Sequence, residues 1–173
     1  MSTAMPVALV TGVGPGTGAA IARRLAAGGY AVAMLARNAE RLGALAATLP
    51  GARAYACDVT NSAALRASVA RVQAEMGAPS VLVHNAVGAT FGTFAEIEAA
   101  ALERNFRVNT VALLELAQLL TPAMIAAGHG AIVVTGNTSA LRGKARFAGF
   151  APTKAAQRIL AEAMARDLGP RGV

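Results

Sequence analysis

The sequence predicts an α/β fold: a doubly wound parallel sheet with helices on both faces. Two observations lead to this class. Short apolar segments of the kind that form buried strands alternate along the chain with longer helix-forming segments. Polar residues gather just after the strands, at residues 12–18, Arg37, Asp58, Asn85 and Asn137. Because ligands bind beyond the carboxyl ends of the strands in such sheets, we expect one binding site there.

The elements can be placed in order along the chain. Residues 7–10 form an apolar first strand, and residues 19–27, which contain no Gly or Pro, form the helix after it. Thr93 and Glu96 have the spacing of a capping box, which predicts that the fourth long helix begins near residue 93. The other predicted strands are residues 30–36, 53–57, 81–83 and 131–135, and the helices are residues 39–48, 61–76, 93–127 and 149–168.

Length and composition limit the class of protein. A chain of 173 residues that is 55% hydrophobic and 14% charged predicts one domain with a real core, and excludes a disordered or fibrous protein. The start of the sequence has no signal-peptide pattern, and polar residues interrupt the apolar stretch 111–134, so we expect no membrane span. The single Cys57 fits a reducing compartment, and we expect a cytoplasmic protein.

The positive charge has a simpler use than nucleic-acid binding. The net charge is +7, but the arginines are scattered singly and aromatic residues make up only 4% of the chain. A nucleic-acid surface usually combines clustered cations with aromatic side chains, so we expect no nucleic-acid partner. A cofactor rich in phosphate would account for part of the charge. We expect no metal site.

The glycine-rich segment 7–18, VALVTGVGPGTG, joins the first strand to the first helix. Glycines allow a sharp turn and a close approach of the backbone to a ligand. The helix that follows directs its free N–H groups and positive dipole end at the same place, which suits a pyrophosphate. A tight strand-to-helix turn without a ligand is the alternative. The residues expected to contact the cofactor here are Gly12, Gly14, Gly16, Thr17 and Gly18. A side chain added at Gly16 or Gly18 is expected to block binding without unfolding the chain.

The spacing T-G-x-x-x-G-x-G of Thr11, Gly12, Gly16 and Gly18 resembles that of the short-chain dehydrogenase/reductase family. The resemblance covers essentially the whole chain and implies a Rossmann-type sheet with strand order 3-2-1-4-5. Family members continue into two more strands, which we expect to be absent here, so that residues 1–173 form a single dinucleotide-binding domain that is incomplete at its C-terminus. A naturally short protein, a truncated chain and a partial record all remain open.

Three residues after the second and third strands are expected to contact the adenosine half of the cofactor, and Arg37 among them predicts which cofactor binds. Arg37 follows the second strand, where an Asp or Glu would favour NAD, and a guanidinium suits the 2′-phosphate of NADP. The resemblance implies that Asp58 accepts a hydrogen bond from the adenine amino group and that Val59 contacts the ring. An exposed arginine and a helix-capping aspartate are the alternatives. We therefore expect NADP(H) rather than NAD(H) as the cofactor.

Further matches to the family lie after the fourth strand and on the following helix. His84-Asn85-Ala86 resembles the family's N-N-A-G segment, with His in place of the first Asn. The resemblance assigns Asn85 and Ala86 to the cofactor site, whereas His84 is interpreted as structural. Asn109 matches the family's helix-four Asn, which holds a water in a proton relay; a hydrogen-bonded core residue is the alternative.

The catalytic positions depart from the family pattern. Lys154 matches the family's Lys, but Phe150 stands four residues before it in place of Tyr, and Asn137 stands in place of Ser. Phe has no proton to give, whereas Asn137 can donate an N–H to a carbonyl oxygen. Ser139 supplies a hydroxyl two residues out of register. Lys154 would also hold the nicotinamide ribose.

Two functions are compatible with these residues. The first is an NADP(H)-dependent oxidoreductase acting on a carbonyl or alcohol of a small molecule, because the hydride comes from the cofactor and the reaction needs only some proton source. The second is a cofactor-binding pseudoenzyme that serves as an oligomerisation partner, which Phe150 and Asn137 favour. In either case the resemblance implies a homodimer or homotetramer built by the helices near 99–124 and 149–168.

Overall fold

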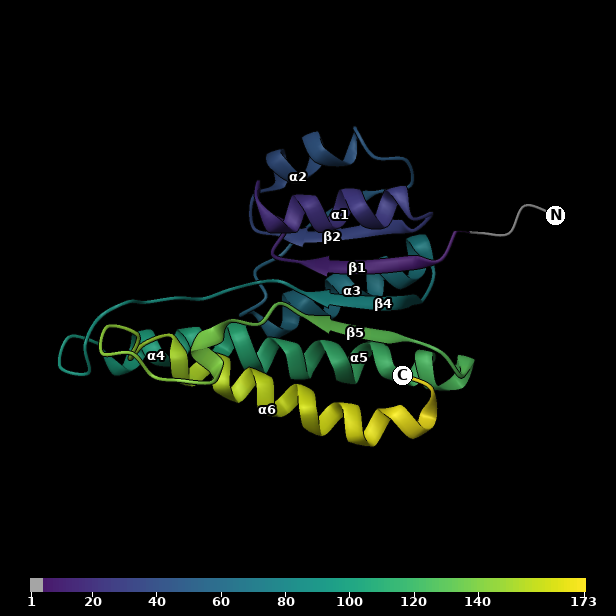
Figure 1. Ribbon diagram of the computed structural model, residues 1–173. Helices are drawn as coiled ribbons and strands as arrows, with labels where there is room; N and C mark the ends of the chain where they lie inside the picture. Colours follow the sequence, from purple (N-terminus) through teal and green to yellow (C-terminus); the bar gives the residue numbers. More distant parts are fainter. Residues whose placement is uncertain (1–4) are drawn as a thin grey trace.

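The structure is a computed structural model that describes residues 5–173 as one α/β layer structure (Figure 1). Its sheet has five strands in the order β3-β2-β1-β4-β5, which confirms the predicted doubly wound topology. Every neighbouring pair is parallel, so the carboxyl ends of all strands meet at one edge. The strands are β1 (Val7–Thr11), β2 (Ala31–Ala36), β3 (Arg53–Ala56), β4 (Pro79–His84) and β5 (Ala131–Val134).

The helices cover both faces of this sheet. One apolar cluster joins β1 and β2 to α1 and α2, and a second joins the other sheet face to α3, α5 and α6. In Figure 1, α5 and α6 lie beside each other along β5. The helices are α1 (Thr17–Ala27), α2 (Ala39–Ala46), α3 (Ser62–Met76), α4 (Ala99–Phe106), α5 (Ala112–Ala127) and α6 (Ala151–Leu168), with short turns η1 (Arg107–Val111), η2 (Thr138–Ala140) and η3 (Gly169–Arg171).

β1 is the centre of the sheet, and its sequence explains why. All five of its residues are buried, and it pairs with β2 on one side and β4 on the other. A strand covered by helices on both faces needs a continuous apolar run rather than an alternating one. The register places Thr11 beside Leu35 and His84, so the glycine-rich segment after β1 emerges at the middle of the carboxyl edge.

The predicted start of the fourth long helix was wrong by six residues. Half of the capping box does form, since the Thr93 N–H donates to Glu96 Oε2 at 2.7 Å, but α4 begins at Ala99 with Glu98 as its N-cap. The box therefore closes an isolated turn in the loop after β4. The last helix also begins later than predicted, at Ala151, because the segment before it is held by turns.

Helix α4, turn η1 and helix α5 form one continuous helix, Ala99–Ala127, which is long enough, and in part apolar enough by composition, to cross a membrane. The same test is passed by core helices of soluble proteins. Here Leu113, Leu116 and Leu120 are each no more than 1% exposed and pack in the larger core cluster.

Candidate active site

A cleft of about 1120 Å³ lies at the carboxyl edge of the sheet, beyond β1, β2 and β4. Its wall gathers the residues predicted to bind the cofactor, although they come from distant parts of the sequence. Lys154 is the exception and lies outside this wall. The predicted residues in the wall are Gly12, Gly14, Gly16, Thr17, Gly18, Arg37, Asp58, Val59, Asn85 and Ala86.

The four glycines of the loop after β1 divide into two pairs. A Cβ on Gly12, which has φ of +67°, would lie 2.5 Å from the backbone of Ala86, and one on Gly18 would lie 2.4 Å from the carbonyl oxygen of Gly12. Those two glycines are needed for packing. A Cβ on Gly14 or Gly16 would meet nothing within 4 Å. The expectation that a Gly18 variant keeps its fold is therefore wrong, while Gly16 faces open space in the cleft.

This loop fits the diphosphate of a dinucleotide. Helix α1 begins at Thr17, so its positive dipole end and its first N–H groups lie beside the open Gly14 and Gly16. Such a helix terminus attracts an anion. The space beside the two open glycines can hold the diphosphate, whereas any other residue there would fill this space with its side chain.

The next part of the cleft carries both charges predicted to hold the adenosine half. Asp58 Oδ1 accepts from the N–H of Thr60 at 2.9 Å and from its hydroxyl at 2.8 Å. These hydrogen bonds lower the pKa of Asp58, and the nearby Arg37 lowers it further. The carboxylate is thus ionised and able to accept a hydrogen bond. It does not cap α3, because the side chain of Asn61 does so by accepting from the Ala64 N–H.

Arg41 also lines the cleft and was missed in the sequence. It follows Arg37 by four residues, and the side chain of Asn38 caps α2 by accepting from the Arg41 N–H at 2.8 Å. Arg41 thus lies in the first turn of α2, beside the end of β2, and the N-cap at Asn38 was the signal in the sequence that could have found it. Arg104 and Arg107 add two more guanidinium groups to the wall.

His84 has a structural position, as predicted. It is fully buried, with Nδ1 3.0 Å from Thr11 Oγ1 and Nε2 3.0 Å from the carbonyl oxygen of Val108. Thr11 Oγ1 already accepts from two backbone N–H groups, at Asn85 and Ala86, so its own proton goes to Nδ1 and Nε2 carries the ring proton. Burial lowers the pKa of His84 to about 4, which keeps the imidazole neutral.

The side chains of Asn85 and Asn109 hold the loop after β4 by hydrogen bonds on two sides. Asn85 Nδ2 donates to the carbonyl oxygen of Gly12 at 2.9 Å, which joins this loop to the glycine-rich segment. The fully buried Asn109 accepts from the Gly88 N–H at 2.9 Å and donates to the Gly88 carbonyl at 2.8 Å. Its Nδ2 is also 2.7 Å from Thr153 Oγ1 on α6. The side chain of Asn109 thus positions the cleft wall against the helix that carries Lys154.

Lys154 is a buried cation on the first turn of α6. It is 3% exposed, and its Nζ donates to the carbonyl oxygen of Thr135 at 2.8 Å and to Gln157 Oε1 at 2.6 Å. Thr135 follows β5, so the ammonium group lies at the same carboxyl edge as the cleft. Burial lowers the pKa of Lys154. An ammonium has three N–H groups, and two are used within the protein.

The other predicted catalytic residues lie around the loop between β5 and α6. Asn137 Oδ1 accepts from the Ser139 N–H at 2.9 Å, which leaves its Nδ2 as the group able to donate to a ligand. Phe150 is 5% exposed, and its ring lies among other rings, 5.5 Å from Phe91 and 6.5 Å from Phe147. Residue 150 therefore contributes an apolar ring and no proton donor.

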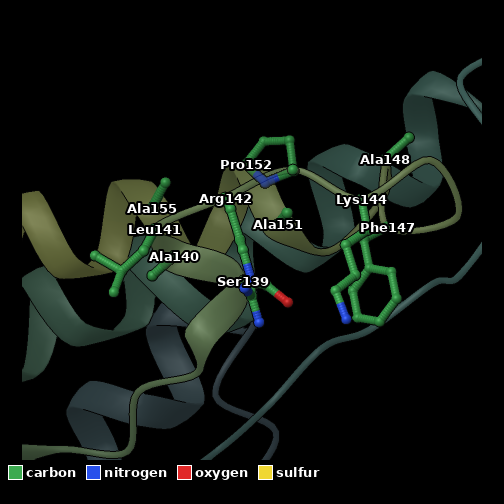
Figure 2. A pocket seen from close by; sticks show the side chains of 11 residues that line it. Ser139, Ala140, Leu141, Arg142, Lys144, Phe147, Ala148, Ala151, Pro152 and Ala155 are labelled. Atoms are coloured by element: carbon green, nitrogen blue, oxygen red, sulfur yellow. The ribbon is translucent and has the colours of Figure 1, made fainter.

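Ser139 lines a second, smaller cavity rather than the dinucleotide cleft. This cavity has a volume of about 380 Å³ and lies between the loop 139–148 and the first turns of α6 (Figure 2). Its wall is mostly apolar, from residues such as Leu141, Phe147 and Pro152, and Figure 2 shows the Lys144 side chain beside the Phe147 ring. Lys144 Nζ lies 5.7 Å from the centre of that ring.

The chain belongs to the short-chain dehydrogenase family, whose family model matches residues 6–173. It is 35% identical to D-erythrulose reductase of Gallus gallus over 167 residues, which cover 96% of this chain and 66% of that protein. It thus spans about two thirds of the length of this relative.

Two similar solved structures contain a bound nicotinamide cofactor. A metagenomic short-chain oxidoreductase in complex with NADP matches with a TM-score of 0.92 at 33% identity, over 99% of this chain and 80% of that one. NAD+-bound xylitol dehydrogenase matches with a TM-score of 0.91 at 30% identity, over 99% of this chain and 68% of that one. The family therefore binds either nicotinamide cofactor, and its members are oxidoreductases.

Proposed function

We propose that this protein is an NADP(H)-dependent oxidoreductase that interconverts a carbonyl and an alcohol on a small molecule. The observation that carries the proposal is the continuous carboxyl edge of the sheet. It holds an open glycine loop at β1, guanidinium groups after β2 and the buried Lys154 ammonium beside β5. D-erythrulose reductase, a relative at 35% identity, supports a hydroxylated ketone as the substrate class.

The residues of the cleft have separate roles in this proposal. Arg37 and Arg41 hold the 2′-phosphate, because a planar guanidinium donates two parallel hydrogen bonds to phosphate oxygens. Asp58 accepts from the adenine amino group and Val59 contacts the ring. Gly14 and Gly16 admit the pyrophosphate at the start of α1. Asn85 and Ala86 form the wall beyond it.

The reaction end of the carboxyl edge, where Lys154, Asn137 and Ser139 lie, has fewer groups that can contact a ligand than the cleft has. When bound, the nicotinamide supplies the hydride. The third N–H of Lys154 binds the nicotinamide ribose, and Asn137 Nδ2 donates to the substrate carbonyl oxygen and stabilises the charge that develops there. Ser139, or a water that reaches this end of the sheet edge, supplies the proton that Phe150 cannot give.

A second function is an NADP(H)-binding pseudoenzyme that acts as an oligomerisation partner. The observation that favours it is the packing of Phe150 among Phe91 and Phe147, which puts an apolar cluster where the family has a hydroxyl. This protein would bind the cofactor in the same cleft and turn over no substrate.

Two measurements on one preparation separate the functions. NADPH binding is followed by the fluorescence of the reduced nicotinamide, and NADPH oxidation is followed with a panel of hydroxylated and simple ketones. The oxidoreductase shows saturable binding and oxidation with at least one ketone. Binding without oxidation favours the pseudoenzyme, and absence of binding contradicts both functions.

We also propose that the protein is cytoplasmic and forms a homodimer or homotetramer through α5 and α6. Leu114 on α5 is 39% exposed and Ile159 on α6 is 57% exposed, and burial of such side chains would stabilise an assembly. Light scattering at tens of micromolar, roughly the range in which weak association is populated, would show the assembly. A monomer at that concentration would contradict it.

A further inference from the structure

The environment of Lys154 lacks the acidic partner that a buried lysine usually has. Among residues 5–173, no carboxylate lies within ion-pair distance of its Nζ. Buried cations are normally paired, because an unpaired charge away from water is costly. The charge is met instead by two uncharged oxygens, one on the backbone of Thr135 and one on the side chain of Gln157.

Gln157 is fixed between Lys154 and a backbone carbonyl. Its Oε1 accepts from Lys154 Nζ at 2.6 Å, and its Nε2 donates to the carbonyl oxygen of Asn109 at 2.8 Å. The ammonium can only donate and the carbonyl can only accept, so the orientation of the amide is determined. The side chain is 1% exposed and lies one turn after Lys154 on α6.

The carbonyl that Gln157 contacts belongs to an irregular turn. Asn109 lies in η1, Arg107–Val111, where the helix between α4 and α5 widens into a π turn. Such turns are rare and often occur at functional sites. The side chain of Asn109 holds Gly88 of the cleft wall, while its backbone oxygen holds Gln157. One residue therefore connects the cleft, the π turn and the Lys154 cluster.

We infer that Gln157 is a positioning residue that holds the Lys154 ammonium at the carboxyl edge of the sheet, beside β5, and that this requires a neutral amide. The inference rests on the proposed function, in which Lys154 binds the cofactor. With two N–H groups held by Thr135 and Gln157, the third is the one left for a ligand. A carboxylate at residue 157 would form an ion pair with the ammonium, and an apolar side chain would remove the hydrogen bonds to the ammonium and to the Asn109 carbonyl.

The other titratable and charged groups near this cluster are either neutral or held in ion pairs. His84 on β4 faces Lys154 and is neutral, with its pKa lowered to about 4. On α6, Arg158 pairs with Glu162 at 2.7 Å, and in η1 Arg107 pairs with Glu115 of α5 at 3.3 Å. Gln157→Glu therefore adds a negative charge beside Lys154 and removes the donor to the Asn109 carbonyl, while these ion pairs stay as they are.

Lysine NMR tests the inference without requiring turnover. The chain has only two lysines, Lys144 and Lys154, so labelling lysine with ¹³C at Cε gives two signals, which Lys144→Arg assigns. Gln157→Glu should raise the titration midpoint of Lys154 by about one pH unit or more, because a carboxylate favours the charged form. Gln157→Met, which has similar volume, should lower the midpoint because it removes a hydrogen bond to the ammonium. Gln118→Glu, on the exposed face of α5, is the matched control and should leave it unchanged.

Cofactor binding gives the second measurement. Gln157→Met should weaken NADPH binding about tenfold, since the ammonium loses its support, and should leave the thermal unfolding transition cooperative. Unchanged Lys154 midpoints in both variants, or movement no larger than in Gln118→Glu, would overturn the inference. If Gln157→Glu fails to fold, the Met variant decides alone. Failure of the proposed function would appear separately, as no NADPH binding by the parent.

Discussion

The two ends of the carboxyl edge of the sheet, one beside the glycine loop and one beside Lys154, differ in how closely they match the family pattern. At the dinucleotide end, the glycine loop, Arg37 and Asp58 line one open cleft. At the reaction end, Phe150 and Asn137 stand where the resemblance predicts hydroxyl groups, and the buried amide of Gln157 accepts a hydrogen bond from Lys154. Cofactor binding depends on backbone geometry and a few charges, whereas proton transfer depends on single side-chain atoms. The side chains for proton transfer can therefore be substituted while the residues for cofactor binding stay the same.

The largest expected effect comes from restoring the missing hydroxyl group. Phe150→Tyr should raise ketone reduction by about 10²–10⁴-fold, the usual contribution of a positioned acid, and Lys154→Met should remove most of the gain. Asn137→Ser added to Phe150→Tyr should raise it further, because the Ser hydroxyl would orient the substrate oxygen. NADPH oxidation with a ketone panel is the measurement.

The control for this series is Phe147→Tyr, which adds a hydroxyl to a neighbouring ring of the same cluster. It should leave the rate near that of the parent. If the parent is already as active as the Phe150→Tyr variant, another group supplies the proton. If both bind NADPH and neither oxidises it, the pseudoenzyme is the correct description.

The second effect concerns stability rather than turnover. The pKa of His84 is about 4 when folded and about 6.5 when unfolded, so the unfolded chain binds the extra proton between these values. Stability from the neutral ring is therefore complete above about pH 6.5 and falls as the pH drops toward 4, by about 3 kcal/mol in total. His84→Asn, which restores the family's residue, should flatten the dependence of unfolding free energy on pH in this window.

Chemical denaturation at several pH values measures the His84 effect. His129→Asn, in an exposed loop, is the matched control and should keep the slope of the parent. The comparison uses slopes, because His84→Asn also changes the absolute stability by altering the hydrogen bonds to Thr11 and Val108. An equal slope in parent and variant would show that the ring is not held neutral.

The third effect returns to the dinucleotide end. Arg37→Ala should cost about 1.5–3 kcal/mol of NADPH binding, which is about 10- to 150-fold, and should leave NADH binding nearly unchanged. The reason is that only NADPH carries the phosphate that a guanidinium binds. Fluorescence titration with both cofactors gives the ratio, and Arg66→Ala on the exposed face of α3 is the control. A ratio equal to that of the parent would mean that Arg37 does not select the cofactor.

The sequence was sufficient for the fold because the fold depends on repeated patterns. The apolar run of β1 and the polar residues after each strand gave the sheet and the place of its cleft. Gln157 could not be found in this way. Its partners are Lys154, three residues earlier, and the backbone of Asn109, 48 residues away on another helix. A buried amide on an amphipathic helix has no signature until packing brings that carbonyl to it.

Gly18 shows a second limit of sequence reasoning. Gly16 and Gly18 are equivalent in the sequence motif, yet the direction of the missing Cβ separates them, toward the Gly12 carbonyl for Gly18 and toward open space for Gly16. The start of α4 is a similar case. Thr93 and Glu96 do form a capping contact, but the residues after them are not helical, and α4 begins only at Ala99. The local capping signal was therefore correct, although it did not mark the start of the helix.

The smallest expected effect separates capping from binding within the dinucleotide end. Asn38 and Asn61 are both N-caps, and their side chains accept from the N–H of Arg41 at 2.8 Å and of Ala64 at 3.0 Å. Replacement of either by Ala should lower the free energy of unfolding by about 1 kcal/mol. Only Asn38 lines the cleft, so only Asn38→Ala should also weaken NADPH binding, because the turn that presents Arg41 loses its cap. Denaturation and fluorescence titration of the two variants measure both effects. Equal NADPH affinities in two equally destabilised variants would show that the cap of α2 supports the fold alone, and that Arg41 is presented to the cleft without it.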